Sequence, residues 1–493
     1  MALLSDFYLS NSKPEDIAIK YQDKKITYNK MHENIIKYAA YYQKIGIQHG
    51  DTIALSSINS PEFIYAYFGA TKIGATVVPL NFMLTLEEIS YIISDSKSNT
   101  LVIHKKIFEK IGVTEEIIKC KLSLKNVIVI DSIFTDSIIE NDNISMPVLS
   151  ENEVSTLLYT SGTTGKPKGV MLTHHNLLSN TKSFIKVLDV KNDEIFLCVL
   201  PMFHTFGFTV TILAPFYLGA SIVIHETFHP KETIRSLIED KITILCAVPS
   251  MYVILSQLLK AENISLPQLK LAISGGAPLP VEVLQSFRNQ YKIPMLEGYG
   301  LTEASPALCF TPMNGKPKVG SIGLPIPDVE IKIVDENGDE LKTGEIGEIL
   351  AKGPNIMKGY LGKPEATAET VVDGWLHTGD LAYKDEDGYI FIVDRKKDLI
   401  ITRGLNVYPR EIEELLYQYP GVLETAVIGV KEETRGEVVK AIIVLKEHAT
   451  VTKKEIMDYL KLHLASYKLP KIVEFVQSLP KNATGKILKK ELS

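Results

Sequence analysis

The chain has 493 residues, of which 45% are hydrophobic and 23% are charged, and its formal net charge is −6. These values are ordinary for a folded globular protein and exclude a disordered, collagen-like or low-complexity chain. The first residues lack an apolar signal segment, and the cysteines lack the paired spacing of zinc sites or disulfide frameworks: Cys120, Cys198, Cys246 and Cys309. We therefore expect a cytoplasmic protein.

Charge is distributed unevenly along the chain. Residues 395–493 contain 18 Lys and Arg against 13 Asp and Glu, a net of +5, whereas the remainder contains 35 against 46, a net of −11. This asymmetry predicts a basic C-terminal unit that faces an anionic ligand. A nucleic acid is not expected, because no basic stripe with interleaved aromatic residues accompanies the charge.

The first elements alternate between helix and strand. Apolar residues at helical spacing from Tyr28 to Ile45 predict a helix, followed by a strand at 51–57, a helix at 61–75 and a strand at 76–80. The same alternation returns with a strand at 242–250, a helix at 251–261 and a strand at 269–276. This pattern predicts an α/β fold.

The segment from Ile195 to Ile224 contains no Asp, Glu, Lys or Arg and is long enough for a membrane span. Prolines and glycines interrupt it, at Pro201, Gly207, Pro215 and Gly219, and the β-branched run at 220–224 suits a buried strand. We therefore expect a pocket wall and no transmembrane segment, while peripheral membrane contact stays open.

The sequence pattern changes near Asp328, where short strands separated by turn residues predict a β-barrel-like subregion. Beyond it, Pro409 followed by several glutamates predicts the start of a helix. Strands at 422–430 and 438–445 and a helix at 453–464 complete a small α+β unit. The charge change places the domain boundary between residues 1–394 and 395–493.

Residues 159–170 read "YTSGTTGKPKGV" and combine glycines, hydroxyls and lysines. Such a loop suits an oxygen-rich anion, with phosphate as the first candidate, although the same composition also makes ordinary solvated turns. The spacing is not that of a nucleotide-kinase loop, because Gly162 lies only three residues before Gly165 and Pro167 blocks an immediate helix start.

Further motifs follow in a fixed order. They are "SGGAPL" at 274–279, "EGYGLTE" at 297–303, "GWLHTGD" at 374–380, "DRKKDLIITRGLNVYPREIEE" at 394–414 and "PKNATGKILKKEL" at 480–492. Each of the short stretches alone is weak, because a glycine turn, a lone tyrosine or a lone aspartate is mostly structural.

Together these motifs resemble the adenylate-forming enzymes: acyl-CoA synthetases, luciferases and peptide-synthetase adenylation domains. Glu297 before the glycine and the run at 404–414 make the chain most similar to bacterial fatty-acid–CoA ligases. The resemblance implies a large N-terminal domain of layered α/β sheets with a β-barrel-like subregion, and a small, mobile α+β C-terminal domain.

The resemblance also implies an ATP site. The phosphates would be enclosed by Thr160, Ser161, Gly162, Thr163, Thr164, Gly165 and Lys168, and the adenine would lie against Gly276, Ala277, Pro278, Tyr299 and Gly300. Asp380 would accept hydrogen bonds from the ribose hydroxyls, supported by Arg395. Glu303 would hold Mg²⁺ between phosphate oxygens, with Thr302 on the phosphate.

Lys486 matches the lysine of the last family motif, whose ammonium would stabilise negative charge on the substrate carboxylate and the α-phosphate. Three neighbours are instead interpreted as solvated lysines of a basic tail: Lys481, Lys489 and Lys490. Lys397 matches the hinge about which the C-terminal domain rotates, and Gly404 would line the CoA tunnel.

His204 and Phe208 are the candidates for the acyl pocket and its carboxylate-facing end. Spacing alone favours the interpretation of His204 as a satisfied core histidine. Phe208 occupies the position at which a long-chain relative has a tryptophan gate, so gating stays open. Ile401 stands where luciferase-like members carry a lysine, a position that the fatty-acid branch commonly leaves without one.

The resemblance implies that a fatty acid, ATP and CoA are converted to acyl-CoA, AMP and pyrophosphate through an acyl-adenylate. The alternatives are an aryl- or other carboxylate–CoA ligase, an enzyme that loads a carrier protein, and a non-catalytic nucleotide sensor on the same fold. The oligomeric state is open, with a homodimer as one arrangement.

Overall fold

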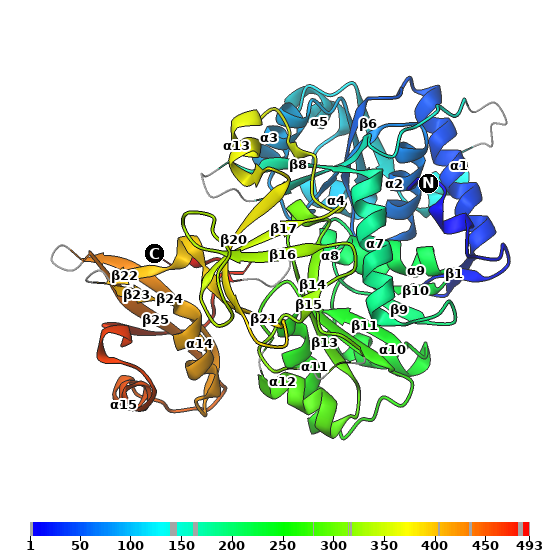
Figure 1. Ribbon diagram of the computed structural model, residues 1–493. Coiled ribbons are helices and arrows are strands. Elements are labelled where there is room, and N and C mark those ends of the chain that lie inside the picture. Colours follow the sequence, from blue (N-terminus) through cyan, green and yellow to red (C-terminus); the bar gives the residue numbers. More distant parts are fainter. Residues whose placement is uncertain are drawn as a thin grey trace.

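The computed structural model describes residues 3–138, 145–160, 166–279, 281–313, 315, 318–402, 405–432, 436–481 and 487–492. Within these residues the chain forms a large lobe and a smaller C-terminal lobe that lies to one side of it (Figure 1). The small lobe has a hydrophobic core of its own.

Two sheets built mainly from parallel strands organise the large lobe. One follows the order β15 (Leu324–Pro325), β14 (Ala307–Phe310), β13 (Met295–Gly300), β12 (Leu271–Gly275), β11 (Ile244–Ala247), β9 (Ile195–Cys198), β10 (Ser221–Ile224), β1 (Ile17–Tyr21) and β2 (Lys24–Thr27). The other follows β18 (Gly359–Tyr360), β8 (Lys168–Thr173), β7 (Val154–Thr160), β4 (Thr76–Leu80), β3 (Thr52–Ser56), β5 (Thr100–His104) and β6 (Asn126–Ile130).

Helices cover these sheets and pack into three hydrophobic clusters, one of which contains residues of both sheets. The longer ones are α1 (Tyr28–Lys44), α2 (Pro61–Lys72), α3 (Leu86–Ser96), α7 (His174–Leu188), α10 (Pro230–Glu239) and α11 (Pro249–Ala261). The shorter ones are α4 (Lys105–Ile111), α5 (Glu115–Lys121), α6 (Ser132–Ser137), α12 (Val281–Gln285) and α13 (Pro364–Thr370), with single turns η1 (Phe7–Leu9), η3 (Ser286–Gln290) and η4 (Thr302–Ala304). Every residue of α2 is buried, and most are apolar, so this helix belongs to the core that contains residues of both sheets.

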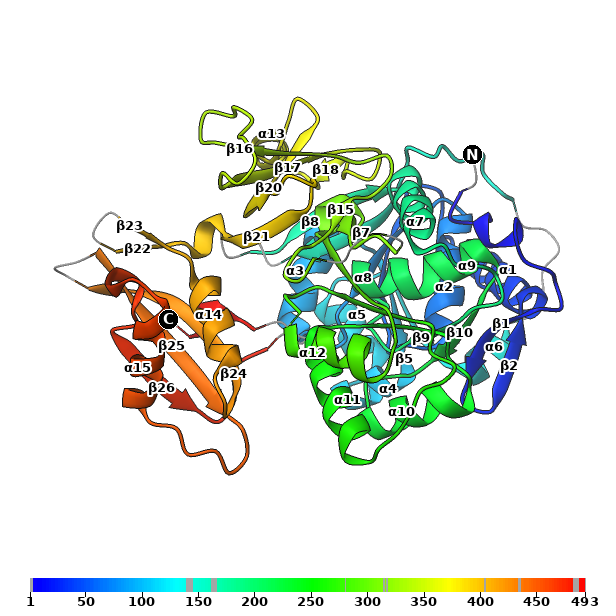
Figure 2. The same ribbon diagram turned by 60° about the horizontal axis from the view of Figure 1, so that its bottom comes forward.

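A third sheet follows the two α/β sheets in the sequence and precedes the small lobe. Its strands are β16 (Glu330–Val334), β17 (Gly347–Lys352), β20 (Trp375–Lys384), β19 (Val371–Val372) and β21 (Ile390–Arg395), which pairs with β20. Figure 2 shows these strands above the large α/β sheets and next to the small lobe. This is the predicted barrel-like subregion.

The small lobe begins after the single turn η5 (Lys396–Asp398). Its sheet contains β23 (Leu405–Val407), β22 (Ile400–Thr402), β25 (Gly436–Leu445), β24 (Val422–Glu432) and β26 (Ile472–Val476), and its helices are α14 (Pro409–Gln418) and α15 (Lys453–His463), with the turns η6 (Ser466–Lys468) and η7 (Lys489–Glu491). Pro409 is the first residue of α14, as its fixed φ and missing N–H favour. The predicted fold, α/β with a small α+β C-terminal part, is confirmed.

The uncharged segment at 195–224 runs through β9, the consecutive turns α8 (Thr205–Phe208), η2 (Thr209–Leu213) and α9 (Ala214–Leu218), and β10. Most of its side chains are buried in the main core. Among the described residues, no helix has both the length and the apolar character needed to cross a membrane. The interpretation of this stretch as buried helix and strand is therefore confirmed.

Candidate active site

Asp380 and Arg395 lie opposite each other on β20 and β21. The Nε atom of Arg395 is 3.1 Å from Oδ1 of Asp380, and the hydroxyl of Tyr299 donates to Oδ2 at 2.6 Å. The side chain of Asp380 is only 7% exposed. The structure thus brings together three of the residues predicted around the ribose and the adenine.

Burial and neighbouring charges shift the pKa values of Tyr299 and Arg395 in this group. Burial raises the pKa of Tyr299, and the neighbouring Asp380 carboxylate raises it further, so the phenol stays a donor. Burial lowers the pKa of Arg395, but Asp380 and other negative groups, Glu303 among them, raise it overall. The charges of both Asp380 and Glu303 therefore act on Arg395.

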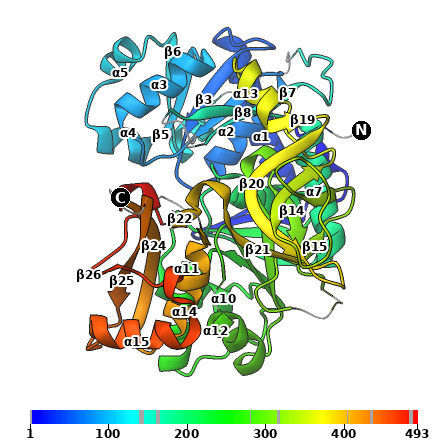
Figure 3. The same ribbon diagram turned by 60° about the vertical axis from the view of Figure 1, so that its left-hand side comes forward.

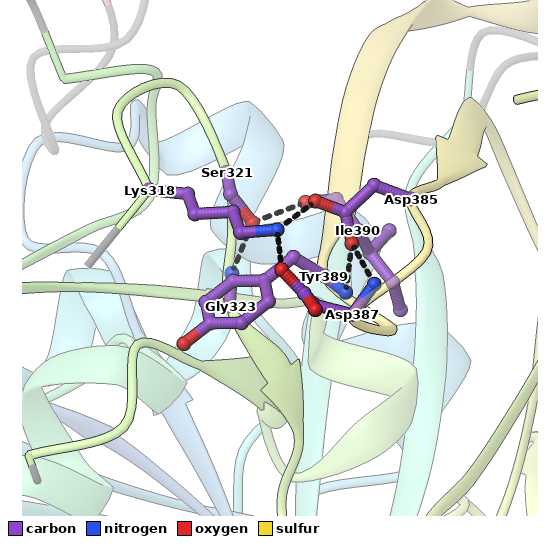
Figure 4. A network of polar contacts seen from close by, with 7 residues as sticks. All are labelled: Lys318, Ser321, Gly323, Asp385, Asp387, Tyr389 and Ile390. Carbon is purple, nitrogen blue, oxygen red and sulfur yellow. Dashed lines mark hydrogen bonds and ion pairs between the residues drawn. The ribbon is translucent and has the colours of Figure 1, made fainter. Parts of the chain in front are cut away.

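The hairpin that carries Asp380 and Arg395 is fixed at its turn. Figure 4 shows Lys318 between Asp385 and Asp387 of the turn, with the Asp387 contact at 2.5 Å. The Lys318 ammonium also lies 4.8 Å from the centre of the Tyr389 ring. Backbone bonds between Gly323 and the start of β21 complete the junction. These contacts fix the turn that joins β20 to β21, the two strands that carry Asp380 and Arg395.

Glu303 and Lys168 meet around Tyr360. The Tyr360 hydroxyl donates to Oε1 of Glu303 at 2.9 Å, and the Lys168 ammonium lies 4.8 Å from the centre of the Tyr360 ring. Tyr360 is placed there because β18 pairs with β8, with Tyr360 opposite Val170. A cation, a carboxylate and a phenol thus lie together at the end of the β7–β8 pair that Lys168 begins.

Thr160 ends β7 and is paired with Lys168 at the start of β8. The two strands therefore carry the ends of the predicted phosphate loop. The first five residues between them lie outside the described part of the chain: Ser161, Gly162, Thr163, Thr164 and Gly165.

Buried asparagines brace the turn that carries Thr302 and Glu303. The Asn355 amide donates to the carbonyls of Ala304 at 2.8 Å and Ala307 at 3.1 Å, and the Asn180 amide, on α7, donates to Ala307 at 2.8 Å. Asn355 is only 1% exposed. Thr302 itself approaches the Thr205 hydroxyl at 3.3 Å. The turn is therefore held on several sides before any ligand binds.

The adenine-side residues follow from the pairing of β12 with β13. Gly275 is opposite Gly298, which places the turn of Gly276, Ala277 and Pro278 near Tyr299 and Gly300. Gly276 has φ +81°, a left-handed conformation that favours glycine, and a Cβ on Gly300 would lie 1.9 Å from the Pro306 carbonyl oxygen. Gly276 and Pro278 are exposed, so this turn offers an open face to a ligand.

The two acyl-pocket candidates differ in environment. His204 is half-buried, and its Nδ1 accepts the Phe206 amide at 3.2 Å, which caps α8. Phe208 is 4% exposed and packs against Tyr67, with ring centres 4.6 Å apart. Phe208 thus lies in an aromatic cluster with Phe63 and Phe68 of α2. Both roles stay predictions.

The lysines predicted to be merely solvated are not all so. Lys481 pairs with Glu424, and Lys489 pairs with Glu413 at 2.7 Å. For these two the prediction is wrong, because carboxylates on β24 and α14 face the chain end. Lys397 lies exposed in η5, while Gly404 and Lys486 lie outside the described residues.

Glu303 fits a Mg²⁺ ion that is shared with a substrate. Among the described residues, no cluster of three or more His, Cys, Asp or Glu could hold a metal by protein ligands alone. Mg²⁺ commonly uses one or two carboxylates together with substrate phosphates and waters. A single partly exposed carboxylate beside Lys168 and Thr302 suits that arrangement.

Tyr360 and Asn355 were not found by sequence reasoning. Tyr360 stands between Gly359 and Gly362, and that spacing was the available signal. Asn355 carried none, because its partners are backbone carbonyls about fifty residues earlier in the chain.

Glu297, which begins the "EGYGLTE" motif, is a buried acid with an unusual pKa. Burial raises its pKa to about 7; Arg410, the Leu279 amide and Arg288 lower it, and Glu414 raises it. Because the native state favours the protonated acid, stability is present at low pH and is lost as the pH rises from about 4.5 to about 7.

Glu297→Gln removes this loss. At pH 5, we expect the melting temperature of the variant to equal that of the unmodified protein or to lie below it. Towards pH 8 it should exceed that of the unmodified protein increasingly, because the free energy of unfolding gains at most about 3 kcal/mol. Thermal unfolding across this pH range measures the difference. The exposed Glu330→Gln is the control, and a Glu297→Gln difference that does not change with pH contradicts the prediction.

The chain matches one protein family over parts of both lobes. Residues 9–361 match the model of the AMP-binding enzyme family, and residues 411–486 match the AMP-binding enzyme C-terminal domain. The chain therefore belongs to the AMP-binding enzyme family, as the motifs predicted.

Its relatives include acid–CoA ligases of two kinds. It is 37% identical to a long-chain-fatty-acid–CoA ligase of Bacillus subtilis, over 97% of this chain and 91% of the relative, and 34% identical to a feruloyl-CoA synthase of Amycolatopsis, over 97% and 96%. ATP-bound MatB from Rhodopseudomonas palustris is 32% identical with a TM-score of 0.92, and apo MatB has 0.81; both comparisons cover 99% of this chain and 97% of MatB. An AMP-forming acid–CoA ligase is the class these relatives support.

Proposed function

We propose that the protein activates a fatty acid with ATP and transfers the acyl group to CoA. The substrate carboxylate attacks the α-phosphorus of ATP, giving acyl-AMP and pyrophosphate. The CoA thiol then attacks the acyl carbon, and AMP leaves. The first step needs positioning and charge neutralisation more than covalent help from the protein.

The observation that carries the proposal is the continuity of the site. Asp380, Tyr299 and Arg395 form one hydrogen-bonded and ion-paired group, and Tyr360 joins Glu303 to Lys168. Glu303 is one of the negative groups that raise the pKa of Arg395, so its charge acts on the guanidinium. A sugar with two hydroxyls and a chain of phosphates fits this sequence of acceptors and cations.

Each residue has one role in this proposal. Asp380 accepts from the ribose hydroxyls, Tyr299 lies against the adenine, and Lys168 binds phosphate. Glu303 would hold Mg²⁺, which supplies charge neutralisation on the phosphates when bound. Lys486, from the C-terminal domain beyond residue 394, would act on the carboxylate and α-phosphate, with Lys397 as hinge and Gly404 at the CoA tunnel.

A fatty acid is proposed as the acid because the uncharged segment at 195–224 gives the large lobe an apolar interior beside His204 and Phe208. The Bacillus subtilis relative supports the same substrate class. An aryl acid is the second candidate, since the feruloyl-CoA synthase covers the chain equally well and Phe208 lies among aromatic rings.

A panel of acids tests the proposal. With ATP, Mg²⁺ and free CoA, we expect AMP production and acyl-CoA formation with the highest kcat/KM for a medium- or long-chain fatty acid. A preference for ferulate or another aryl acid would move the assignment to the second candidate. Adenylate formation without thioester formation on free CoA would favour a carrier-protein acceptor, and no AMP with any acid would favour a nucleotide sensor.

A further inference from the structure

Asp394 joins the large lobe to the first helix of the small lobe. It lies on β21, one residue before Arg395, and it is 6% exposed. Its Oδ1 accepts the Arg395 amide at 2.8 Å, and its Oδ2 accepts the Arg410 amide, in the first turn of α14, also at 2.8 Å. Helix α14 packs beside β21 at this point, as Figure 3 allows one to follow.

This carboxylate supplies the helix cap that α14 lacks in its own sequence. Its N-cap residue, Tyr408, makes no capping hydrogen bond with its side chain. The first N–H groups of a helix need acceptors, and an anion there also suits the helix dipole. The acceptor for Arg410 comes from sixteen residues earlier in the chain, across η5. The cap therefore exists only while α14 is docked on β21.

The contact continues from α14 to the chain end. Glu413, one turn further along α14, pairs with Lys489 at 2.7 Å and also accepts the Val427 amide at 2.7 Å. Lys489 begins η7, three residues after Lys486 in the sequence. One series of polar contacts thus runs from the strand that holds Arg395, through Asp394 and α14, to the segment that follows Lys486.

We propose that Asp394 is a positioning residue that holds the small lobe in the arrangement that serves acyl-adenylate formation. The inference rests on the proposed function for its two half-reactions. The TM-score of the chain is 0.92 against ATP-bound MatB and 0.81 against apo MatB, which supports an arrangement of the lobes like that of the ATP-bound relative. Rotation about η5 to serve the thioester step would withdraw the Arg410 amide from Asp394, so the contact favours one arrangement over the other.

Asp394→Asn tests the inference with little change of shape. An asparagine has one acceptor oxygen and a donor in place of the second, so one of the two amide contacts is lost. We expect ATP–pyrophosphate exchange to fall roughly tenfold, as for the loss of a hydrogen bond to a charged group. The reaction of supplied acyl-AMP with CoA should keep its rate or become faster. Glu386→Gln, an exposed acid at the turn of the same hairpin, is the control and should change neither rate.

A distance measurement keeps the inference separate from the proposed function. Cys120 is the exposed cysteine and the other three are buried, so spin labels on Cys120 and on Glu447→Cys report the distance between the lobes. With ATP bound, Asp394→Asn should broaden this distance distribution. The measurement requires no turnover, so the result does not depend on whether the protein activates an acid. An unchanged distribution, an equal loss in both half-reactions, or a loss in the thioester step alone would overturn the inference. If the unmodified protein forms no adenylate, the proposed function fails and the distances alone decide about Asp394.

Discussion

Lys486→Ala is expected to bind ATP normally and to form acyl-adenylate roughly 10²–10³-fold more slowly. The reason is that an ammonium placed between the carboxylate and the α-phosphate stabilises negative charge that is greatest in the transition state. Binding of the triphosphate depends instead on the large-lobe residues Asp380, Tyr299 and Lys168. The two effects should therefore separate cleanly.

ATP–pyrophosphate exchange and equilibrium binding of ATP measure these two effects. Lys481→Ala is a matched control from the same basic tail, because Lys481 pairs with Glu424 on β24 and such a partly exposed pair contributes little. Its exchange rate should be close to that of the unmodified protein. Exchange at an undiminished rate in Lys486→Ala would exclude the proposed role of that lysine.

The elements were predictable where local patterns and packing agree. The strand at 76–80 and the helix that begins at Pro409 appear as expected, because β-branched residues and an N-terminal proline favour those conformations locally. The helix predicted at 61–75 ends at Lys72. The last three residues of the predicted helix form a turn instead, because Gly74 has a φ of +77°, which ends helical geometry.

The pairing of distant residues was predictable only through the family resemblance. Asp380 and Arg395 belong to separate motifs, and nothing in their spacing reveals that β20 and β21 place them opposite each other. Tyr360 and Asn355 remained hidden for the same reason, because long-range contacts to Glu303 and to backbone carbonyls leave no periodic signal. Lys489 was misjudged since its partner, Glu413, lies on another element.

Asp380→Asn should raise the KM for ATP roughly 10²-fold while changing the KM for the acid little. The carboxylate accepts from Tyr299 at 2.6 Å and pairs with Arg395 at 3.1 Å, and in the proposed complex it also accepts from both ribose hydroxyls. An asparagine keeps one acceptor oxygen and loses the charge that balances Arg395. Ground-state and transition-state binding of the nucleotide then weaken together, so kcat should fall less than kcat/KM.

Steady-state kinetics with ATP and the acid varied separately tests this expectation. Asp373→Asn is the matched control: Asp373 is exposed in the turn before β20, and its φ of +50° is a conformation that asparagine tolerates well. Both kinetic constants of the control should match those of the unmodified protein. If Asp380→Asn left the KM for ATP unchanged, or raised the KM for the acid as strongly, Asp380 would not be the ribose acceptor, and its bonds to Tyr299 and Arg395 would be purely structural.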